Sequence, residues 1–293
     1  MYHRVAEPAD DPYALAVRPA HFEQHVEHLR RRADVVPLTD WFEPSRAARI
    51  AVTFDDGYVD NATTAAPVLE QAGLPATWFL TTGTLGGARF WWDVLADVLL
   101  QEPRSPGLDL DVAGRRLWLD LGTPAARRGA LAVVRRRLKP LPPDVVAHEV
   151  ERIGRRCGVP VPAEDSRTMS AAQVRELAAR AGADVGAHTR SHLMLGGQSA
   201  ALQRDEVLGS AADVAALTGR PVTAFAYPFG DPAAVGDLAP DLAAEAGCWL
   251  ACTTAPGLAG RDRDPFHLPR TAVGDWDGAE FAARLAAALS AAG

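Results

Sequence analysis

Two short motifs carry side chains that could do chemistry. The first runs from Thr53 to Gly57 and places two adjacent carboxylates, Asp55 and Asp56, directly after an apolar run. Neighbouring side chains on an extended chain point in different directions, so one carboxylate could bind a metal ion while the other transfers protons. The plainer alternative is a polar turn that Gly57 closes, and the buried strand predicted in front of it weighs against that alternative.

The second motif covers residues 188–192, reads His-Thr-Arg-Ser-His, and follows another strand-like run at 184–187. Two histidines four positions apart on a tight turn can bring both imidazoles to one metal ion. Combined with a carboxylate of the first motif, they supply two nitrogens and one oxygen. Such a three-ligand set is typical of a catalytic zinc site, because it leaves one coordination position open for water.

A rival set of histidines lies on the first predicted helix. His21, His25 and His28 follow one another at helical spacing, but they flank an apolar stripe and do not follow a strand. We therefore interpret them as residues at the edge of a buried helix face and not as metal ligands.

The elements that would position both motifs alternate regularly. The pattern predicts strands at 35–38, 50–54, 76–80, 184–187, 223–226 and 249–253, separated by amphipathic helices. Such repeated βα units form a parallel sheet, either open or closed into a barrel. Both motifs directly follow a strand, at the end where these sheets place their functional sites.

Residues 86–165 break this alternation. They contain a predicted hairpin at 108–120 and two arginine-rich helices. We interpret this stretch as a mostly helical insertion within a single domain that spans residues 1–293.

Composition excludes several classes of function. The 293 residues include 30 basic and 37 acidic side chains, a net charge of −7, so we expect no nucleic-acid partner. No apolar run reaches the ~18 residues that a membrane span needs, and the N-terminus has no signal-peptide stretch. We therefore expect a cytoplasmic protein with no membrane span. The sequence leaves the oligomeric state open.

Missing motifs narrow the chemistry further. Lys139 is the only lysine, which argues against a Schiff-base mechanism and a Walker phosphate loop. The chain has no Gly-x-Ser-x-Gly elbow and no Gly-x-Gly-x-x-Gly loop. Its three cysteines form neither a disulfide framework nor a Cys-x-x-Cys pair.

A third motif completes a resemblance to a known family. Residues 225–230 read Phe-Ala-Tyr-Pro-Phe-Gly, and with the motifs at 53–57 and 188–192 they resemble the polysaccharide deacetylases, the NodB-homology family or carbohydrate esterase family four. The resemblance implies an α/β fold, a distorted and incomplete (β/α)7 barrel. It also implies an enzyme that uses a metal-activated water to remove N-acetyl groups from an amino sugar or polysaccharide.

The resemblance also implies roles for individual residues. One divalent ion, Zn²⁺ before Co²⁺, Ni²⁺ or Fe²⁺, is expected on Asp56, His188 and His192, with Asp55 as the catalytic base. The acetyl-binding groove is expected at Tyr227, Pro228 and Phe229, where the Tyr227 amide could help to hold the oxyanion.

The chain departs from the family pattern in two places. Ala226 stands where an arginine usually pairs with the catalytic aspartate, and no clear C-terminal Leu-x-His supplies the general acid. Tyr2-His3 resembles the N-terminal motif of the branch that includes poly-N-acetylglucosamine deacetylases. We therefore assign the acid to His3, with His267 as the alternative, and the arginine partner of Asp55 to Arg270.

The sequence is compatible with several kinds of substrate. Trp92 and Asp93 could contact a sugar, since tryptophan faces stack on sugar rings, although they also anchor helices in cores. An N-acetylated carbohydrate is the leading substrate. The alternatives are a small non-polymeric amide and a catalytically inactive carbohydrate-binding relative.

Overall fold

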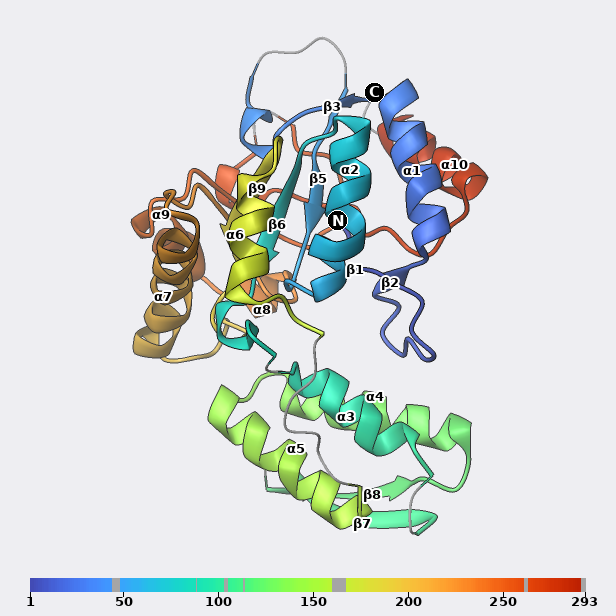
Figure 1. Cartoon of the computed structure of the whole chain (residues 1–293). Coiled ribbons are helices and arrows are strands. Elements are labelled where there is room, and N and C mark those ends of the chain that lie inside the picture. Colours follow the sequence, from blue (N-terminus) through green and yellow to red (C-terminus); the bar gives the residue numbers. More distant parts are fainter. Residues whose placement is uncertain are drawn as a thin grey trace. The chain divides into compact units, whose positions relative to one another are not determined.

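A computed structural model describes residues 1–43, 48–87, 89–102, 105–112, 114–159, 167–260 and 263–290. The chain forms two compact units (Figure 1). The first comprises Met1–Gly86 with Ser166–Gly293, and the second comprises Gly87–Asp165. That the two units act as one deacetylase domain stays a prediction.

A parallel sheet forms the centre of the first unit. Its five strands are β5 (Val52–Phe54), β6 (Ala76–Leu80), β9 (Ala183–Ala187), β10 (Ala224–Ala226) and β11 (Leu250–Cys252). They lie in the order β11-β10-β9-β6-β5, and each neighbouring pair is parallel. Their side chains are almost all buried, as expected for a parallel sheet that is covered on both faces.

Single bridges extend this sheet at both edges. Tyr2 pairs with Phe54 beside β5, and Leu268 pairs with Cys252 beside β11, both in the parallel sense. The two added segments also meet, because the Val273 amide donates a hydrogen bond to the Met1 carbonyl at 3.0 Å. The sheet thus curls into the distorted, incomplete barrel that the sequence predicts.

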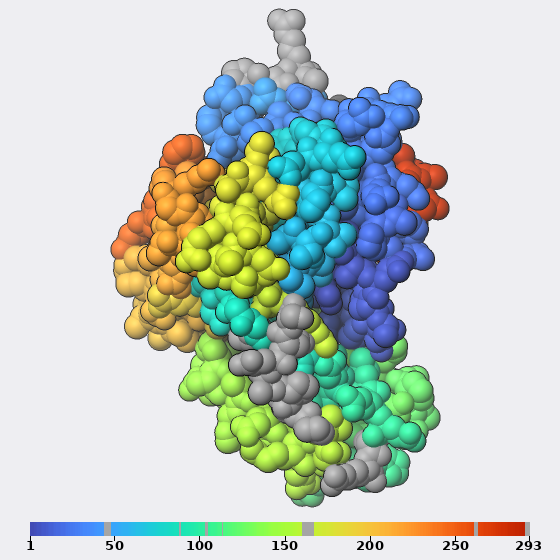
Figure 2. All heavy atoms as spheres, in the orientation of Figure 1, coloured from blue at the N-terminus to red at the C-terminus, as the bar shows by residue number. Residues whose placement is uncertain are grey.

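Helices surround the curled sheet. They are α1 (Pro19–Arg32), α2 (Ala66–Ala72), α6 (Ala171–Ala179), α7 (Ala200–Thr218), α8 (Pro232–Val235), α9 (Ala239–Glu245) and α10 (Gly278–Ser290). Figure 1 shows α7 and α9 on one side of the sheet and α1 with α10 on the other. Helices α2 and α6 cover its near face, which the space-filling view shows as a closed surface (Figure 2).

Local signals explain where several helices begin and end. Ser170 and Gln173 form a capping box at the start of α6, and Gly73 ends α2 in the left-handed conformation with φ of 68°. Helix α1 buries Phe22, Val26 and Leu29, as its periodicity predicts.

Two predicted strands differ from the structure. The run at 50–54 divides into β4 (Arg49–Ile50) and β5, because Ile50 pairs with Val35 whereas Val52 pairs with Ala76. The run at 35–38 gives only β3 (Asp34–Val35) and a 3-10 turn, η1 (Leu38–Asp40).

Several short elements complete the first unit. Two more 3-10 turns, η3 (Thr82–Thr84) and η4 (Pro265–His267), follow β6 and β11. A short pair of strands, β1 (Arg4–Val5) and β2 (Ala16–Val17), lies near the N-terminus.

The second unit is a helix-and-hairpin structure. It contains α3 (Trp91–Leu100), the antiparallel strands β7 (Gly107–Val112) and β8 (Arg115–Asp120), α4 (Pro124–Leu138) and α5 (Pro143–Cys157). The hairpin of β7 and β8 and the arginine-rich helices α4 and α5 agree with the predicted hairpin and two helices, whereas α3 was not predicted. No helix within the described part of the chain is long and apolar enough to cross a membrane.

Candidate metal centre

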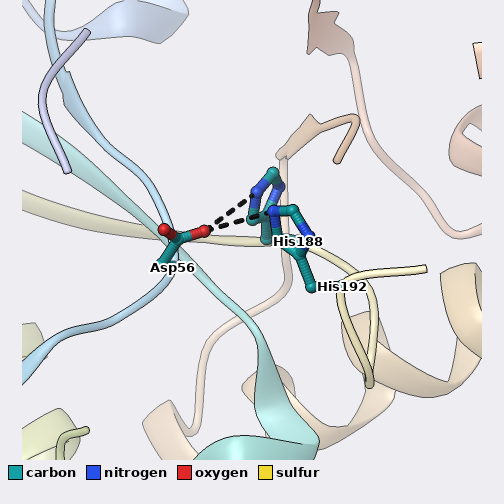
Figure 3. A group of neighbouring side chains, drawn as sticks. All are labelled: Asp56, His188 and His192. Atoms are coloured by element: carbon teal, nitrogen blue, oxygen red, sulfur yellow. Dashed lines mark ion pairs between the residues drawn. The ribbon is translucent and has the colours of Figure 1, made fainter. Parts of the chain in front are cut away.

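The ends of β5 and β9 bring the first two motifs together. Asp56 Oδ1 lies 3.5 Å from His188 Nε2 and 3.3 Å from His192 Nε2. Figure 3 shows both imidazole rings turned toward the same carboxylate oxygen. All three side chains are buried. Among the described residues, these are the ones whose histidine, cysteine and carboxylate atoms cluster closely enough to hold a metal ion.

The donor atoms of this cluster fit a divalent cation. Asp56 Oδ1 is buried, and no described residue gives it a hydrogen bond of good geometry. The His188 Nδ1 donates to the Ala226 carbonyl at 2.7 Å, which leaves the lone pair of Nε2 directed toward Asp56. Metal-bound histidines are typically oriented in this way, and two nitrogens with one carboxylate oxygen form a catalytic zinc set.

The electrostatics of the cluster keep the Asp56 carboxylate ionised. Burial opposes ionisation of Asp56, but His188 and His192 outweigh it and hold the pKa of this carboxyl far below its ordinary value. Burial likewise opposes protonation of His188, yet Asp56, Asp55 and the Ala226 carbonyl raise its pKa overall. For His192 burial prevails and lowers the pKa. The site therefore holds a buried, ionised carboxylate beside two imidazoles.

The backbone around the cluster is strained. Asp56, Thr189, His192 and Phe229 have φ values of 77°, 63°, 57° and 62°, in the left-handed region that non-glycine residues avoid. In the described part of the chain only Ala14 shares this feature among the non-glycine residues. Each such residue costs about 1–3 kcal/mol and persists only where the surroundings enforce it, as happens often at functional sites.

Asp55 is held by an arginine from the far end of the chain. Arg270 Nη1 and Nη2 each lie 2.7 Å from a different oxygen of the Asp55 carboxylate, and Arg270 Nε donates to the Thr253 carbonyl at 3.0 Å. Burial opposes ionisation of Asp55, but Arg270 with His188 and His3 more than offsets it, so the pKa of Asp55 lies below its ordinary value. The structure thus brings together the two residues that the sequence pairs.

The backbone of His3 is fixed beside both carboxylates. The Asp55 amide donates to the Tyr2 carbonyl at 3.0 Å, and Asn61 Nδ2 donates to the His3 carbonyl at 2.8 Å. His3 lies close enough that its charge influences the pKa of both Asp55 and Asp56. Burial lowers the pKa of His3, and the two carboxylates partly restore it.

The alternative acid, His267, has a different environment. It belongs to η4, its side chain is about half exposed, and its Nδ1 lies 2.8 Å from Asp264 Oδ2. The hydrogen bonds and ion pairs of the described residues do not connect it to Asp55 or Asp56. Of the two histidines, His3 is the one whose charge influences both carboxylates, and its role as the acid stays a prediction.

The third motif gives one correction. The Tyr227 amide donates to the Cys252 carbonyl at 3.0 Å, because the pairing of β10 with β11 continues by one residue. This amide is therefore engaged in the sheet and does not serve as the expected oxyanion donor. The Tyr227 ring is buried against Phe225, whereas the half-buried Phe229 ring packs edge-on against His192 with centroids 4.7 Å apart.

Trp92 and Asp93 lie in α3 of the second unit. Trp92 is buried and stacks on Phe90 with ring centroids 4.3 Å apart, and Asp93 is buried beside it. This packing favours the helix-anchoring reading of the tryptophan. The contact of either residue with substrate stays a prediction.

The histidines of α1 have other partners. His25 lies between the Tyr2 hydroxyl at 3.3 Å and the Trp276 carbonyl at 2.7 Å, and its ring stacks on Phe281. His21 pairs with Asp275 at 2.8 Å. These contacts agree with a structural role.

Two polar residues at the site have no assignment from the sequence. Asp60 accepts hydrogen bonds from the Val5 amide at 2.8 Å and from Arg4 Nε at 3.0 Å, and the neighbouring Asn61 holds His3. Asn61 begins a short π-helix, η2 (Asn61–Ala65), an irregularity that is frequent at functional sites. Only their position just after the first motif could have indicated that they matter.

A comparison with known proteins shows which family the chain belongs to. Residues 43–101 and 153–248, more than half of the chain, match the sequence profile of the polysaccharide deacetylases. The chain belongs to the polysaccharide deacetylase family. No curated protein sequence matches it.

Solved structures of deacetylases share the fold of this family member. A Bacillus cereus polysaccharide deacetylase matches 97% of the chain with a TM-score of 0.62 and 19% identity, and the match covers 66% of that protein. The Streptococcus pyogenes deacetylase PplD matches 99% of the chain and 96% of its own length, with a TM-score of 0.63 and 17% identity. IcaB from Ammonifex degensii matches 98% of the chain and 94% of its own length, with a TM-score of 0.58 and 17% identity. The chain thus spans just under two thirds of the Bacillus protein and nearly the whole of the other two.

Proposed function

We propose that this protein is a metal-dependent hydrolase that removes N-acetyl groups from amino sugars in a carbohydrate. The observation that carries this proposal is the buried cluster of Asp56, His188 and His192 beside an Asp55 carboxylate that Arg270 holds. A carboxylate for proton transfer next to an open metal-ligand set is what amide hydrolysis by water requires. Family membership supplies the substrate class.

Asp56, His188 and His192 would hold one divalent ion. Two imidazole nitrogens and one carboxylate oxygen favour Zn²⁺, and Co²⁺, Ni²⁺ and Fe²⁺ suit similar ligands. When bound, the ion lowers the pKa of a water molecule to about 7 and polarises the acetyl carbonyl.

Asp55 acts as the general base in this proposal. Its lowered pKa keeps the carboxylate ionised at neutral pH, so that it can accept a proton from the water that attacks the carbonyl carbon. The bidentate contact with Arg270 fixes the carboxylate plane and prevents Asp55 from rotating toward the metal ligands.

His3 acts as the general acid. After water adds to the carbonyl carbon, the carbon–nitrogen bond breaks and the sugar nitrogen takes a proton from the His3 imidazolium. The products are acetate and the free amine. The two carboxylates beside His3 partly offset the burial that lowers the pKa of its ring.

Pro228 and Phe229 form the wall against which the acetyl methyl would pack. Phe229 contacts the His192 ring directly, so the wall adjoins the metal ligands. The S. pyogenes deacetylase with the same fold has been solved with acetate, the product expected here.

The proposal is tested with a substrate panel and a metal analysis of the purified protein. We expect about one divalent ion per chain and acetate release from N-acetylglucosamine monomers, oligomers or polymers. Release only from small non-sugar amides would support the small-amide alternative. Metal and carbohydrate binding with no acetate release from any substrate would indicate an inactive carbohydrate-binding relative.

A further inference from the structure

The loop that carries both histidines of the metal centre makes an unusual turn. His188 and His192 stand at its two ends, and Thr189 and His192 both adopt left-handed backbone conformations. Such a loop needs support from outside, because its own backbone does not favour this shape.

Glu206 of α7 supplies that support. Its side chain is buried, with 3% of the residue exposed. Its Oε2 accepts the amides of Arg190 at 2.8 Å and Ser191 at 2.9 Å, and its Oε1 accepts the Ser191 hydroxyl at 2.5 Å. A buried carboxylate requires such donors, and here all three come from the two residues just before His192.

The other side of the loop is fixed by η3. The Thr82 amide donates to the Thr189 carbonyl at 3.1 Å, and the Gly83 amide donates to the Arg190 carbonyl at 2.7 Å. Gly83 allows this approach, since a Cβ there would lie 2.5 Å from the Arg190 oxygen. The carbonyls of the loop are thus held by η3 and its amides by Glu206.

We propose that Glu206 is a positioning residue for the metal centre, which holds the 188–192 loop in the one shape that directs both histidines at Asp56. The inference rests on the metal site of the proposed function. Glu206 hydrogen-bonds neither histidine, so it acts through the backbone of Arg190 and Ser191. Loss of the Glu206 charge would remove neither histidine. It would allow the 188–192 loop to relax from its strained shape.

The adjacent Asp205 provides a matched control. It also belongs to α7 and also contacts Arg190, but it pairs with the guanidinium at 2.7 Å from a side chain that is 61% exposed. It does not touch the loop backbone. A general effect of removing negative charge near Arg190 would appear equally in Glu206→Gln and Asp205→Asn.

The test measures Zn²⁺ affinity by competition with a chromophoric chelator, together with the visible absorption of the Co²⁺-loaded protein. Glu206→Gln should weaken Zn²⁺ binding about 10–100-fold, as loss of outer support does at metal sites, and should change the Co²⁺ spectrum. Asp205→Asn should stay within about twofold of the unaltered protein with the same spectrum, as expected for an exposed pair.

Unchanged affinity and spectrum in a folded Glu206→Gln protein would overturn the inference, and so would equal effects of the two variants. If Glu206→Gln does not fold, Ser191→Ala tests the inference, because it removes only the hydroxyl contact with Glu206. Ser191→Ala should weaken Zn²⁺ binding several-fold and shift the Co²⁺ spectrum. Wild-type affinity and spectrum in Ser191→Ala would then overturn it. Failure of the unaltered protein to bind any metal would instead refute the metal site of the proposed function, and with it this inference.

Discussion

Replacing Arg270 by alanine should destabilise the protein and move its activity to higher pH. Arg270 makes two charge-assisted hydrogen bonds of 2.7 Å to the buried Asp55 carboxylate. Removing one partner of a buried ion pair typically costs about 3–5 kcal/mol, since the other charge stays buried without compensation. In a unit the size of the first one, each kcal/mol of lost stability lowers the melting temperature by about 2–4 °C. The melting temperature at pH 7 should therefore fall by about 6–20 °C.

The same change predicts a direction for the pH dependence. In the folded protein the pKa of Asp55 is below its ordinary value, so its ionised form contributes stability above the pKa of the unfolded chain. This contribution is lost as the pH falls through the folded pKa. Without Arg270, the main influence that offsets burial is lost, so the pKa of Asp55 should rise. The acid limb of the activity profile should move upward accordingly.

Thermal melts at pH 7 and pH profiles of acetate release test both expectations. Arg284→Ala is the matched control. Arg284 forms an ion pair of 2.8 Å with Glu280, but the two side chains are 55% and 46% exposed. That pair should contribute about 0–1 kcal/mol. The reasoning is refuted if Arg270→Ala melts like Arg284→Ala and keeps the acid limb of the unaltered enzyme.

Four further substitutions separate the proposed roles. Asp55→Asn should keep the bound metal ion but lower turnover by about 10²–10⁴-fold, because the base is lost and the metal ligands remain. Loss of the metal ion in this variant would exchange the roles of Asp55 and Asp56. His3→Ala should lower turnover by about 10²-fold or more at unchanged metal content, and a larger loss in His267→Ala would move the acid to that histidine. Asn61→Ala removes the side-chain hydrogen bond to the His3 carbonyl and should reduce kcat while metal affinity stays constant, which a metal titration and steady-state kinetics would check.

Short motifs allowed much of the site to be predicted from the sequence. Asp56, His188 and His192 come from motifs at strand ends, and parallel strands place their carboxyl ends at one edge of a sheet. The Asp55–Arg270 pair could be anticipated because Ala226 leaves the usual arginine position empty. In each case a local pattern and the fold class together specify which residues meet.

Features that depend on tertiary pairing were not predictable in this way. The Tyr227 amide was assigned to the oxyanion, but its partner is the Cys252 carbonyl, which only the register of β10 against β11 determines. Glu206 lies on a helix whose sequence gives no sign that one buried carboxylate faces a loop 15 residues earlier. Strand 50–54 divides because its two halves pair with different neighbours, which periodicity cannot show.

The most direct test of the proposed function is acetate release from N-acetylglucosamine oligomers by protein that has been stripped of metal and then reloaded. We predict that a chelator abolishes the release and that Zn²⁺ or Co²⁺ restores it, whereas the Asp56→Asn variant stays inactive under both conditions. Acetate release that survives complete removal of metal, or that Asp56→Asn retains in full, would contradict the account.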